Sequence, residues 1–115
     1  MSHDPNCIFC RIAAGEIPAQ KVHEDDELIA FKDIRPAAPV HLLIIPREHI
    51  ATLADAEPRH QALLGRMALL ATKLAREHGA DNGFRTVINT GPDGGQEVYH
   101  LHMHVMGGPR PWKQG

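Results

Sequence analysis

The sequence predicts an α+β domain with a mainly antiparallel sheet and one long helix. Short segments of alternating apolar and polar residues lie on both sides of a single stretch with helical periodicity, an order typical of that fold class. The stretch runs from Asp55 to His78 and repeats apolar residues at spacings of three and four. Because no internal repeat or linker divides the chain, residues 1–115 are expected to form one domain, with extended tails at 1–6 and 109–115.

The first half of the chain is predicted to form a short helix and three strands. Residues 7–14 carry apolar side chains at helical spacing and precede Gly15, which can end a helix. Residues 20–24 and 27–32 are typical of two strands, separated by a pair of aspartates that favour a hairpin turn. Residues 41–45 are a short apolar run closed by a proline, as expected of a buried strand.

The second half is predicted to form the long helix followed by two strands. Asp55 can cap the start of the helix. Residues 84–89 alternate like a half-buried strand, and residues 90–96 form a glycine-rich loop. Residues 98–106 alternate with a strict period of two, which predicts a strand with one apolar face.

Composition and charge exclude several classes of protein. The chain has 115 residues, 43% of them hydrophobic, and a formal net charge of -2, so no basic excess favours binding to nucleic acid or a membrane surface. No apolar run approaches the roughly 20 residues that a transmembrane helix requires. The start of the chain lacks the pattern of a signal peptide, so a cytoplasmic protein is expected.

The most informative residues are three of the nine histidines. His100, His102 and His104 alternate with apolar residues, so in a strand they share one face, with successive Cα atoms about 6.8 Å apart. Neutral imidazoles can act as nucleophiles, bases or metal ligands. Two other interpretations remain open at this point: a polar strand facing solvent, which is the simpler one, and a histidine cluster that only binds metal, which is the stronger rival.

Two further features accompany the histidines. The glycine-rich loop at 90–96 lies just upstream of them and can bring backbone N–H groups close to an anion, while Asn89 offers a donor and an acceptor. Cys7 and Cys10 form a C-x-x-C pair near the start of the chain. That spacing fits a metal site, a redox pair or two buried thiols.

The run H-L-H-M-H-V-M at 100–106 resembles the signature of the histidine triad (HIT) family. Nearly the whole chain is similar to the Hint branch of that family. The similar stretches include E-I-P at 16–18, F-K-D-I at 31–34, P-V-H-L-L-I-I-P at 39–46, V-I-N-T-G at 87–91, D-G-G-Q-E-V-Y-H at 93–100, Gly107-Gly108 and Trp112. The resemblance implies a meander of five antiparallel strands with one long and one short helix, and a homodimer.

The resemblance also implies an activity. Hint-type proteins are nucleotide-binding hydrolases that cleave purine nucleoside 5′-phosphoramidates to an amine and a nucleoside monophosphate, and the chemistry requires no cofactor. His102 is then the nucleophile that forms a covalent nucleotidyl-histidine, and the backbone carbonyl of His100 holds its other ring nitrogen. His104 contacts the phosphate oxygens. His41 lies behind the site as the fourth histidine of the family.

The nucleotide-binding residues implied by the family are spread along the chain. Asp33 accepts hydrogen bonds from the ribose hydroxyls. Asn89, Gly95, His102 and His104 face the phosphate. The base pocket is lined by apolar side chains, namely Ile8, Phe9, Ile17, Phe31 and Ile34.

One position departs from the Hint pattern. Glu97 stands where the family commonly has a serine that contacts the leaving group. A carboxylate there can act as a general acid if protonated, can repel an anionic leaving group, or can simply face solvent. A dinucleoside polyphosphate hydrolase of the HIT family and a non-catalytic nucleotide- or zinc-binding regulator are the alternative functions.

The resemblance gives the cysteine pair a specific role. Some HIT proteins bind a structural zinc ion through a C-x-x-C pair and two histidines. The corresponding residues are Cys7, Cys10, His49 and His100. Two thiolates and two imidazoles are a suitable tetrahedral ligand set for Zn²⁺.

Overall fold

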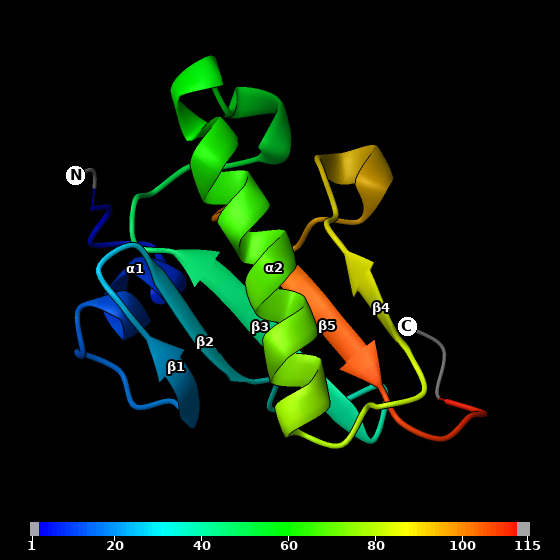
Figure 1. Ribbon diagram of the computed structural model, residues 1–115. Helices are drawn as coiled ribbons and strands as arrows, with labels where there is room; N and C mark the ends of the chain where they lie inside the picture. Colours follow the sequence, from blue (N-terminus) through cyan, green and yellow to red (C-terminus); the bar gives the residue numbers. More distant parts are fainter. Residues whose placement is uncertain (1–2, 113–115) are drawn as a thin grey trace.

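The computed structural model describes residues 3–112, which form a five-stranded sheet with a helix on each face (Figure 1). The predicted fold class, α+β with an antiparallel sheet, is confirmed. The elements are α1 (Ile8–Ala13), β1 (Lys21–Glu24), β2 (Leu28–Lys32), β3 (Val40–Pro46), α2 (Gln61–Glu77), β4 (Phe84–Val87) and β5 (Met103–Gly107). The expected tails lie partly outside the described residues.

The strands are ordered β1-β2-β3-β5-β4, and every neighbouring pair is antiparallel. The central pair is β3 with β5, where Leu43 lies opposite His104 and His41 lies opposite Met106. Because residues opposite each other in such a pair point to the same face, His41, Leu43 and His104 share one face of the sheet. This register brings two histidines that are 63 residues apart onto neighbouring strands.

The two faces of the sheet carry different cores. Helix α2 packs across one face, where its buried residues Met67 and Leu74 join Leu42, Ile44 and Val105. Alternate residues of the same strands point to the other face. There they pack with α1 in a second cluster of buried residues, which comprises Cys7, Phe9, Cys10, Ile12, Ile29, Phe31, Leu43 and Ile45. The histidines on β3 and β5 therefore lie on the α1 side, away from the long helix.

The long helix begins later than the sequence predicts. The chain first makes two short 3₁₀ turns, Leu53–Asp55 and Pro58–His60, and α2 starts at Gln61. Asp55 does not cap α2; its carboxylate accepts a hydrogen bond from the Thr52 hydroxyl at 2.9 Å. Local hydrogen bonds of this kind favour a turn over an added helical turn.

The last strand is shorter than predicted, because residues 98–102 are not part of the sheet. Segment 98–102 is held instead by other bonds, among them one from the Leu101 N–H to the Ile50 carbonyl at 2.6 Å. The neighbouring β4 also differs from the prediction. Three of its four residues are exposed rather than alternating, and among the described residues β4 pairs with β5 alone, at the edge of the sheet.

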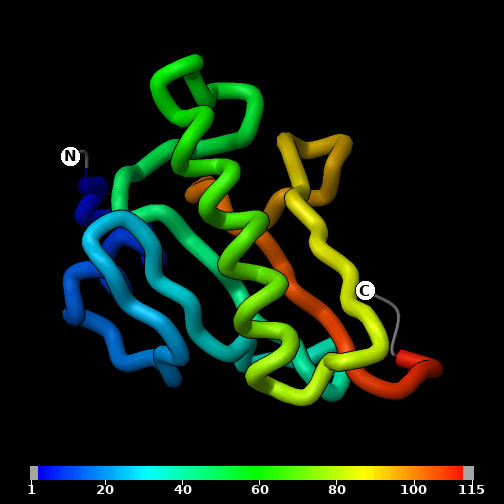
Figure 2. Tube along the Cα trace, in the orientation of Figure 1, coloured from blue at the N-terminus to red at the C-terminus, as the bar shows by residue number. Residues whose placement is uncertain are grey.

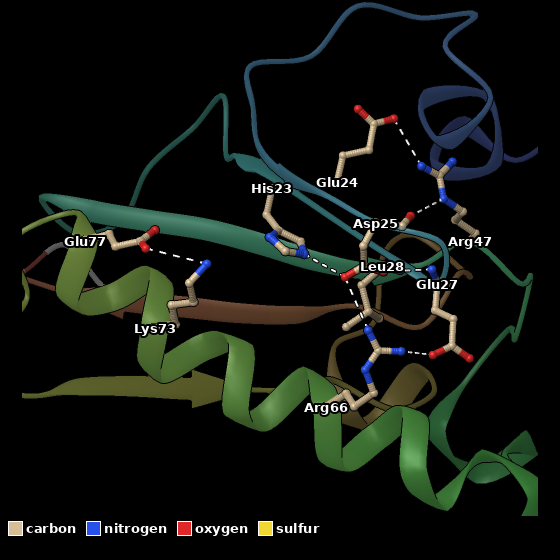
Figure 3. Close-up of polar contacts among 9 residues, drawn as sticks. All are labelled: His23, Glu24, Asp25, Glu27, Leu28, Arg47, Arg66, Lys73 and Glu77. Carbon is tan, nitrogen blue, oxygen red and sulfur yellow. Dashed lines mark hydrogen bonds and ion pairs between the residues drawn. The ribbon is translucent and has the colours of Figure 1, made fainter.

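A network of ion pairs joins the β1–β2 turn to the rest of the molecule (Figure 3). The predicted turn is confirmed, with the Asp25 carboxylate accepting the backbone N–H groups of Glu27 and Leu28 at 2.8 Å each. Arg66 of α2 pairs with Asp25 and Glu27. Arg47, just after β3, donates to the backbone carbonyls of Asp25 and of Ala13, the last residue of α1. These contacts link both helices to the same hairpin.

After β5 the described chain turns back (Figure 2), and Trp112 comes close to Arg85 of β4. The guanidinium groups of Arg85 and Arg110 each lie over the Trp112 ring, at 5.2 and 4.8 Å from its centroid. Within residues 3–112, neither helix is long and apolar enough to span a bilayer.

Candidate functional site

The nucleophile candidate, His102, has one ring nitrogen tied to the backbone. Its Nδ1 lies 2.8 Å from the carbonyl oxygen of His100. A carbonyl only accepts hydrogen bonds, so Nδ1 carries the proton and, in the neutral ring, Nε2 keeps its lone pair. The ring is buried and meets the edges of Phe9 and His104 at centroid distances of 5.1 Å each. This arrangement orients the imidazole and leaves Nε2 as the nitrogen that the backbone does not hold.

A chain of hydrogen bonds extends from the backbone to His104. The Ala37 N–H donates to His41 Nδ1 at 2.9 Å, which leaves the His41 proton on Nε2. That N–H lies 3.0 Å from His104 Nδ1 and 3.4 Å from an Asp33 carboxylate oxygen. With Nδ1 accepting, neutral His104 carries its proton on Nε2. We call Asp33, His41 and His104 the relay cluster.

Burial keeps the relay histidines neutral at pH 7. Burial, together with the neighbouring His102 and His41, lowers the pKa of His104 to about 4, and the Asp33 carboxylate opposes this effect. Burial also lowers the pKa of His41, although the Asp33 carboxylate opposes this effect. His104 can therefore donate a hydrogen bond through its protonated nitrogen without bringing a positive charge.

The residues expected to form a base pocket are only partly brought together. Phe9 and Phe31 are buried and meet edge to face at 5.6 Å, and Ile17 packs against the same cluster. Ile8 and Ile34 face solvent, with exposed fractions of 48% and 93%. The Phe9 ring also contacts His102, so the aromatic pair lies directly beside the nucleophile candidate.

The glycine-rich loop forms a short 3₁₀ turn, Pro92–Gly94. Asn89, which follows β4, hydrogen-bonds to this turn. The Asn89 side-chain amide donates to the Gly94 carbonyl at 2.8 Å, so its nitrogen is already engaged. Gly95 has φ +77°, a left-handed conformation that favours glycine. Glu97 is exposed and follows this loop.

Gln96 has a structural role at the site that the sequence did not predict. Gln96 is buried, and its Oε1 accepts the Gly91 N–H at 2.9 Å. Its amide nitrogen donates to the carbonyls of Ala51 and Val98 at 2.8 and 3.0 Å. Gln96 thus fastens the glycine-rich loop to two other segments. No periodicity signals such a role, because all three partners are backbone groups.

The four residues expected to bind zinc converge into what we call the metal cluster: Cys7, Cys10, His49 and His100. Their ligand atoms all lie within 4.8 Å of one another. His100 Nδ1 is 3.3 Å from Cys7 Sγ, 3.5 Å from Cys10 Sγ and 3.3 Å from His49 Nδ1. Zn–N and Zn–S bonds of ordinary length place tetrahedral ligand atoms about 3.3 to 3.8 Å apart. The spacing fits a zinc ion.

The proton positions in the metal cluster also fit a cation. His100 Nε2 lies 2.7 Å from the Pro46 carbonyl and must donate to it, so Nδ1 offers a lone pair to the cluster. Burial lowers the pKa of His100 to about 4, which keeps the ring in its ligand form. Burial raises the pKa of the Cys10 thiol to about 11, so a bound cation would have to stabilise its thiolate.

The relay cluster also has ligand atoms within 4.8 Å of one another, yet it fits a metal poorly. The Ala37 N–H holds the lone pair of His41 Nδ1, so the Nε2 that faces Asp33 and His104 carries a proton. A metal could bind Nε2 only if that proton left or the bond to Ala37 broke. The geometry therefore supports a hydrogen-bonded chain here.

Comparisons with known proteins agree with this arrangement. The family described as "Scavenger mRNA decapping enzyme C-term binding" matches residues 6–114. Protein HitA of Neisseria gonorrhoeae is 61% identical over 104 residues, which cover 90% of this chain and 97% of that protein. A HIT family hydrolase from Legionella pneumophila superposes with a TM-score of 0.88 at 52% identity, covering 91% of this chain and 95% of the other. The chain belongs to the histidine triad family, and its fold is that of the hydrolases in it.

Two relatives have names that describe an activity or a ligand. The purine nucleoside phosphoramidase of Escherichia coli (strain K12) is 49% identical over 102 residues, covering 88% of this chain and 86% of that protein. The 14 kDa zinc-binding protein of Brassica juncea is 50% identical over 103 residues, covering 88% and 91%. A zinc-bound histidine triad family protein from Mycobacterium smegmatis has a TM-score of 0.78 at 36% identity, covering 89% and 74%.

Proposed function

We propose that this protein hydrolyses purine nucleoside 5′-phosphoramidates through a covalent intermediate on His102. The observation that carries the proposal is the 2.8 Å contact between His102 Nδ1 and the His100 carbonyl, which leaves Nε2 as an oriented nucleophile. The relative named purine nucleoside phosphoramidase supports this choice of substrate class.

The reaction proceeds in two displacements at phosphorus. In the first, His102 Nε2 bonds to the α-phosphorus while the P–N bond breaks, and the amine leaves after taking up a proton from water. In the second, water attacks phosphorus, the His102–phosphorus bond breaks and the nucleoside monophosphate is released. Dividing the hydrolysis into two steps is the advantage of covalent catalysis. The His100 carbonyl stabilises the positively charged His102 ring of the covalent intermediate, which forms in the first step and is hydrolysed in the second.

The neighbouring residues bind and orient the nucleotide. His104 donates its Nε2–H to a phosphoryl oxygen, and His41 fixes the proton on that nitrogen. Asp33 accepts hydrogen bonds from the ribose hydroxyls. Asn89, Gly95 and Glu97 face the phosphate and the leaving group. The base packs against apolar side chains from α1, β2 and the loops beside them, namely Ile8, Phe9, Ile17, Phe31 and Ile34.

The metal cluster binds a structural zinc ion in this proposal. Cys7, Cys10, His49 and His100 hold the ion, which stabilises the fold and takes no part in bond breaking. The zinc-binding relative and the zinc-bound structural neighbour support this assignment. Free thiols of this kind persist in a reducing compartment, which favours the cytoplasm.

A homodimer is also part of the proposal. The edge strand β4 has one side of its backbone unpaired within the described residues, and Leu69 on α2 is 75% exposed. An unpaired strand edge and an exposed apolar side chain are each features that suit pairing with a second copy. Size-exclusion chromatography with light scattering measures the mass, and a monomer at micromolar concentration would contradict this part of the proposal.

The decisive experiment measures turnover of adenosine 5′-phosphoramidate by the wild-type chain and by His102→Ala. We expect AMP release by the wild type and a loss of at least about 1,000-fold in the variant, because the covalent step disappears. Intact-mass spectrometry of a quenched reaction should detect a nucleotidyl adduct in the wild type only. Hydrolysis of diadenosine polyphosphate without hydrolysis of the phosphoramidate would overturn the proposal, as would nucleotide binding with no turnover of either substrate.

A further inference from the structure

His100 contacts both the metal cluster and the nucleophile candidate, His102. Its side chain points into the metal cluster, where Nδ1 lies within 3.5 Å of three other ligand atoms. Its backbone carbonyl, on the same residue, holds Nδ1 of His102 at 2.8 Å. The residue is fully buried, so its ring and carbonyl move together. Whatever fixes the His100 ring also fixes the hydrogen-bond acceptor of the nucleophile.

A second connection runs through the short helix α1. Cys7 caps this helix by accepting the Cys10 N–H at 3.3 Å, so the two cysteines hold its first turn. Phe9 stands between them in the sequence and meets the rings of His100 and His102 edge-on, at 5.9 and 5.1 Å between centroids. The aromatic wall beside the nucleophile is thus part of the same helical turn as two ligands.

We propose that Cys7, Cys10 and His49 are positioning residues for catalysis, and that metal binding sets the orientation and the tautomer of His102 through His100 and Phe9. The inference rests on the proposed metal site and on the proposed role of His102. None of the three residues touches the substrate. Their effect reaches the reacting nitrogen through one carbonyl and one aromatic ring.

The physical basis is the number of constraints on His100. With a metal bound, its ring is fixed at Nδ1 by the ion and at Nε2 by the Pro46 carbonyl. Without the ion, His100 Nδ1 keeps only weak thiol contacts, so the Pro46 bond is the one strong constraint on the ring, and α1 is held less firmly to His49 and His100. His102 then samples both tautomers, and Nε2 is the lone-pair nitrogen for only part of the time.

The primary test is an NMR measurement on wild-type protein without substrate. Protein labelled with ¹⁵N-histidine is prepared with zinc and after removal of zinc by a chelator. We expect the His102 ring to show the Nδ1–H tautomer in the zinc form and a mixture of both tautomers after chelation. Returning zinc should restore the first spectrum. This measurement reads the nucleophile directly and does not depend on which substrate the enzyme cleaves.

The second test separates positioning from general loss of stability. Cys10→Ser removes a ligand, whereas Ile12→Ala truncates a buried side chain of the same helix and leaves every ligand in place. Both variants should lower the unfolding temperature. Only Cys10→Ser should lower the rate of nucleotidyl-histidine formation, by about 10- to 100-fold with little change in KM, because misplacing a reacting group acts on the chemical step.

The possible outcomes are distinct. A His102 tautomer that is unchanged by chelation, with only the unfolding temperature lowered, would overturn the inference and leave the proposed function intact. An equal loss of kcat in Cys10→Ser and Ile12→Ala would overturn it as well. Failure of the wild type to turn over phosphoramidate would count against the proposed function, while the NMR result would still decide the coupling.

Discussion

The metal cluster and the relay cluster are built from similar residues but offer opposite chemistry. In each cluster, a buried histidine is hydrogen-bonded to a backbone group. Whether that group is a donor or an acceptor decides which ring nitrogen carries the proton. The Pro46 carbonyl accepts a hydrogen bond from His100 Nε2, so the lone pair of Nδ1 faces the metal cluster. The Ala37 N–H donates to His41 Nδ1, so the proton on Nε2 faces the relay cluster. A single backbone contact thus distinguishes a metal ligand from a proton donor.

The largest effect is expected from removing the thiolates. The double variant Cys7→Ser and Cys10→Ser should reduce bound zinc from about one equivalent per chain to none, because hydroxyls replace both soft ligands. The free energy of unfolding should fall by several kcal/mol, on the order of what a structural metal site contributes. Metal analysis and denaturant unfolding measure the two quantities.

The matched control for that prediction is Asp33→Asn in the relay cluster. It should keep its zinc, because the relay cluster is a hydrogen-bonded chain. If Asp33→Asn lost the metal and the double cysteine variant retained it, the assignment of the two clusters would be reversed.

A smaller effect is expected from breaking the relay. In His41→Asn the shorter amide no longer reaches His104, so nothing fixes the tautomer of His104 and its donor to the phosphate is lost for part of the time. We expect kcat to fall about 10- to 100-fold with zinc retained, within the range for groups that handle protons. Steady-state kinetics and metal analysis on the same sample test this.

His23→Asn is the control for the relay variant. His23 is paired with Asp25 at 2.7 Å in the hairpin network, outside both clusters (Figure 3). Its kcat should match that of the wild type. A similar loss in both variants would mean that the fall in His41→Asn reflects general destabilisation.

The smallest effect concerns pH. Since the pKa of folded His104 is lowered to about 4 and an unfolded imidazole titrates near 6.5, the unfolded chain binds more protons between these values. The free energy of unfolding should therefore fall as pH drops from about 6.5 to about 4, by on the order of 2 kcal/mol from this residue. Denaturant unfolding of the wild type and His104→Gln at both pH values isolates the contribution. Equal pH dependence in the two proteins would argue against a buried neutral His104.

The sequence predicts the strands and the family more accurately than it predicts the contacts inside the site. Alternation over 98–106 correctly placed the three histidines on one side, but it overstated the strand, because residues 98–102 bond to segments such as Ile50 that lie far away in sequence. The helix start at Asp55 was wrong for a different reason, since a local bond to Thr52 formed instead. Hydrophobic periodicity does not show which of these competing bonds forms.

The groups that give the histidines their roles are the hardest to predict. Ala37, Pro46 and Gln96 act through backbone atoms or on backbone atoms, and any residue type supplies a carbonyl. The resemblance to the HIT family placed His41 and His49 near the triad, which spacing alone could not do. The protonation pattern became visible only once the chain was folded.

The sheet also separates stability from chemistry. The α2 face carries a core of apolar residues, and the histidines of both clusters contact the α1 face. Substitutions that strengthen the α2 face can raise thermal tolerance while the reacting groups stay where they are, which avoids the loss of activity that often accompanies stabilisation. Protein engineering for stability, or adaptation to a higher growth temperature, can therefore act on the α2 face of the sheet.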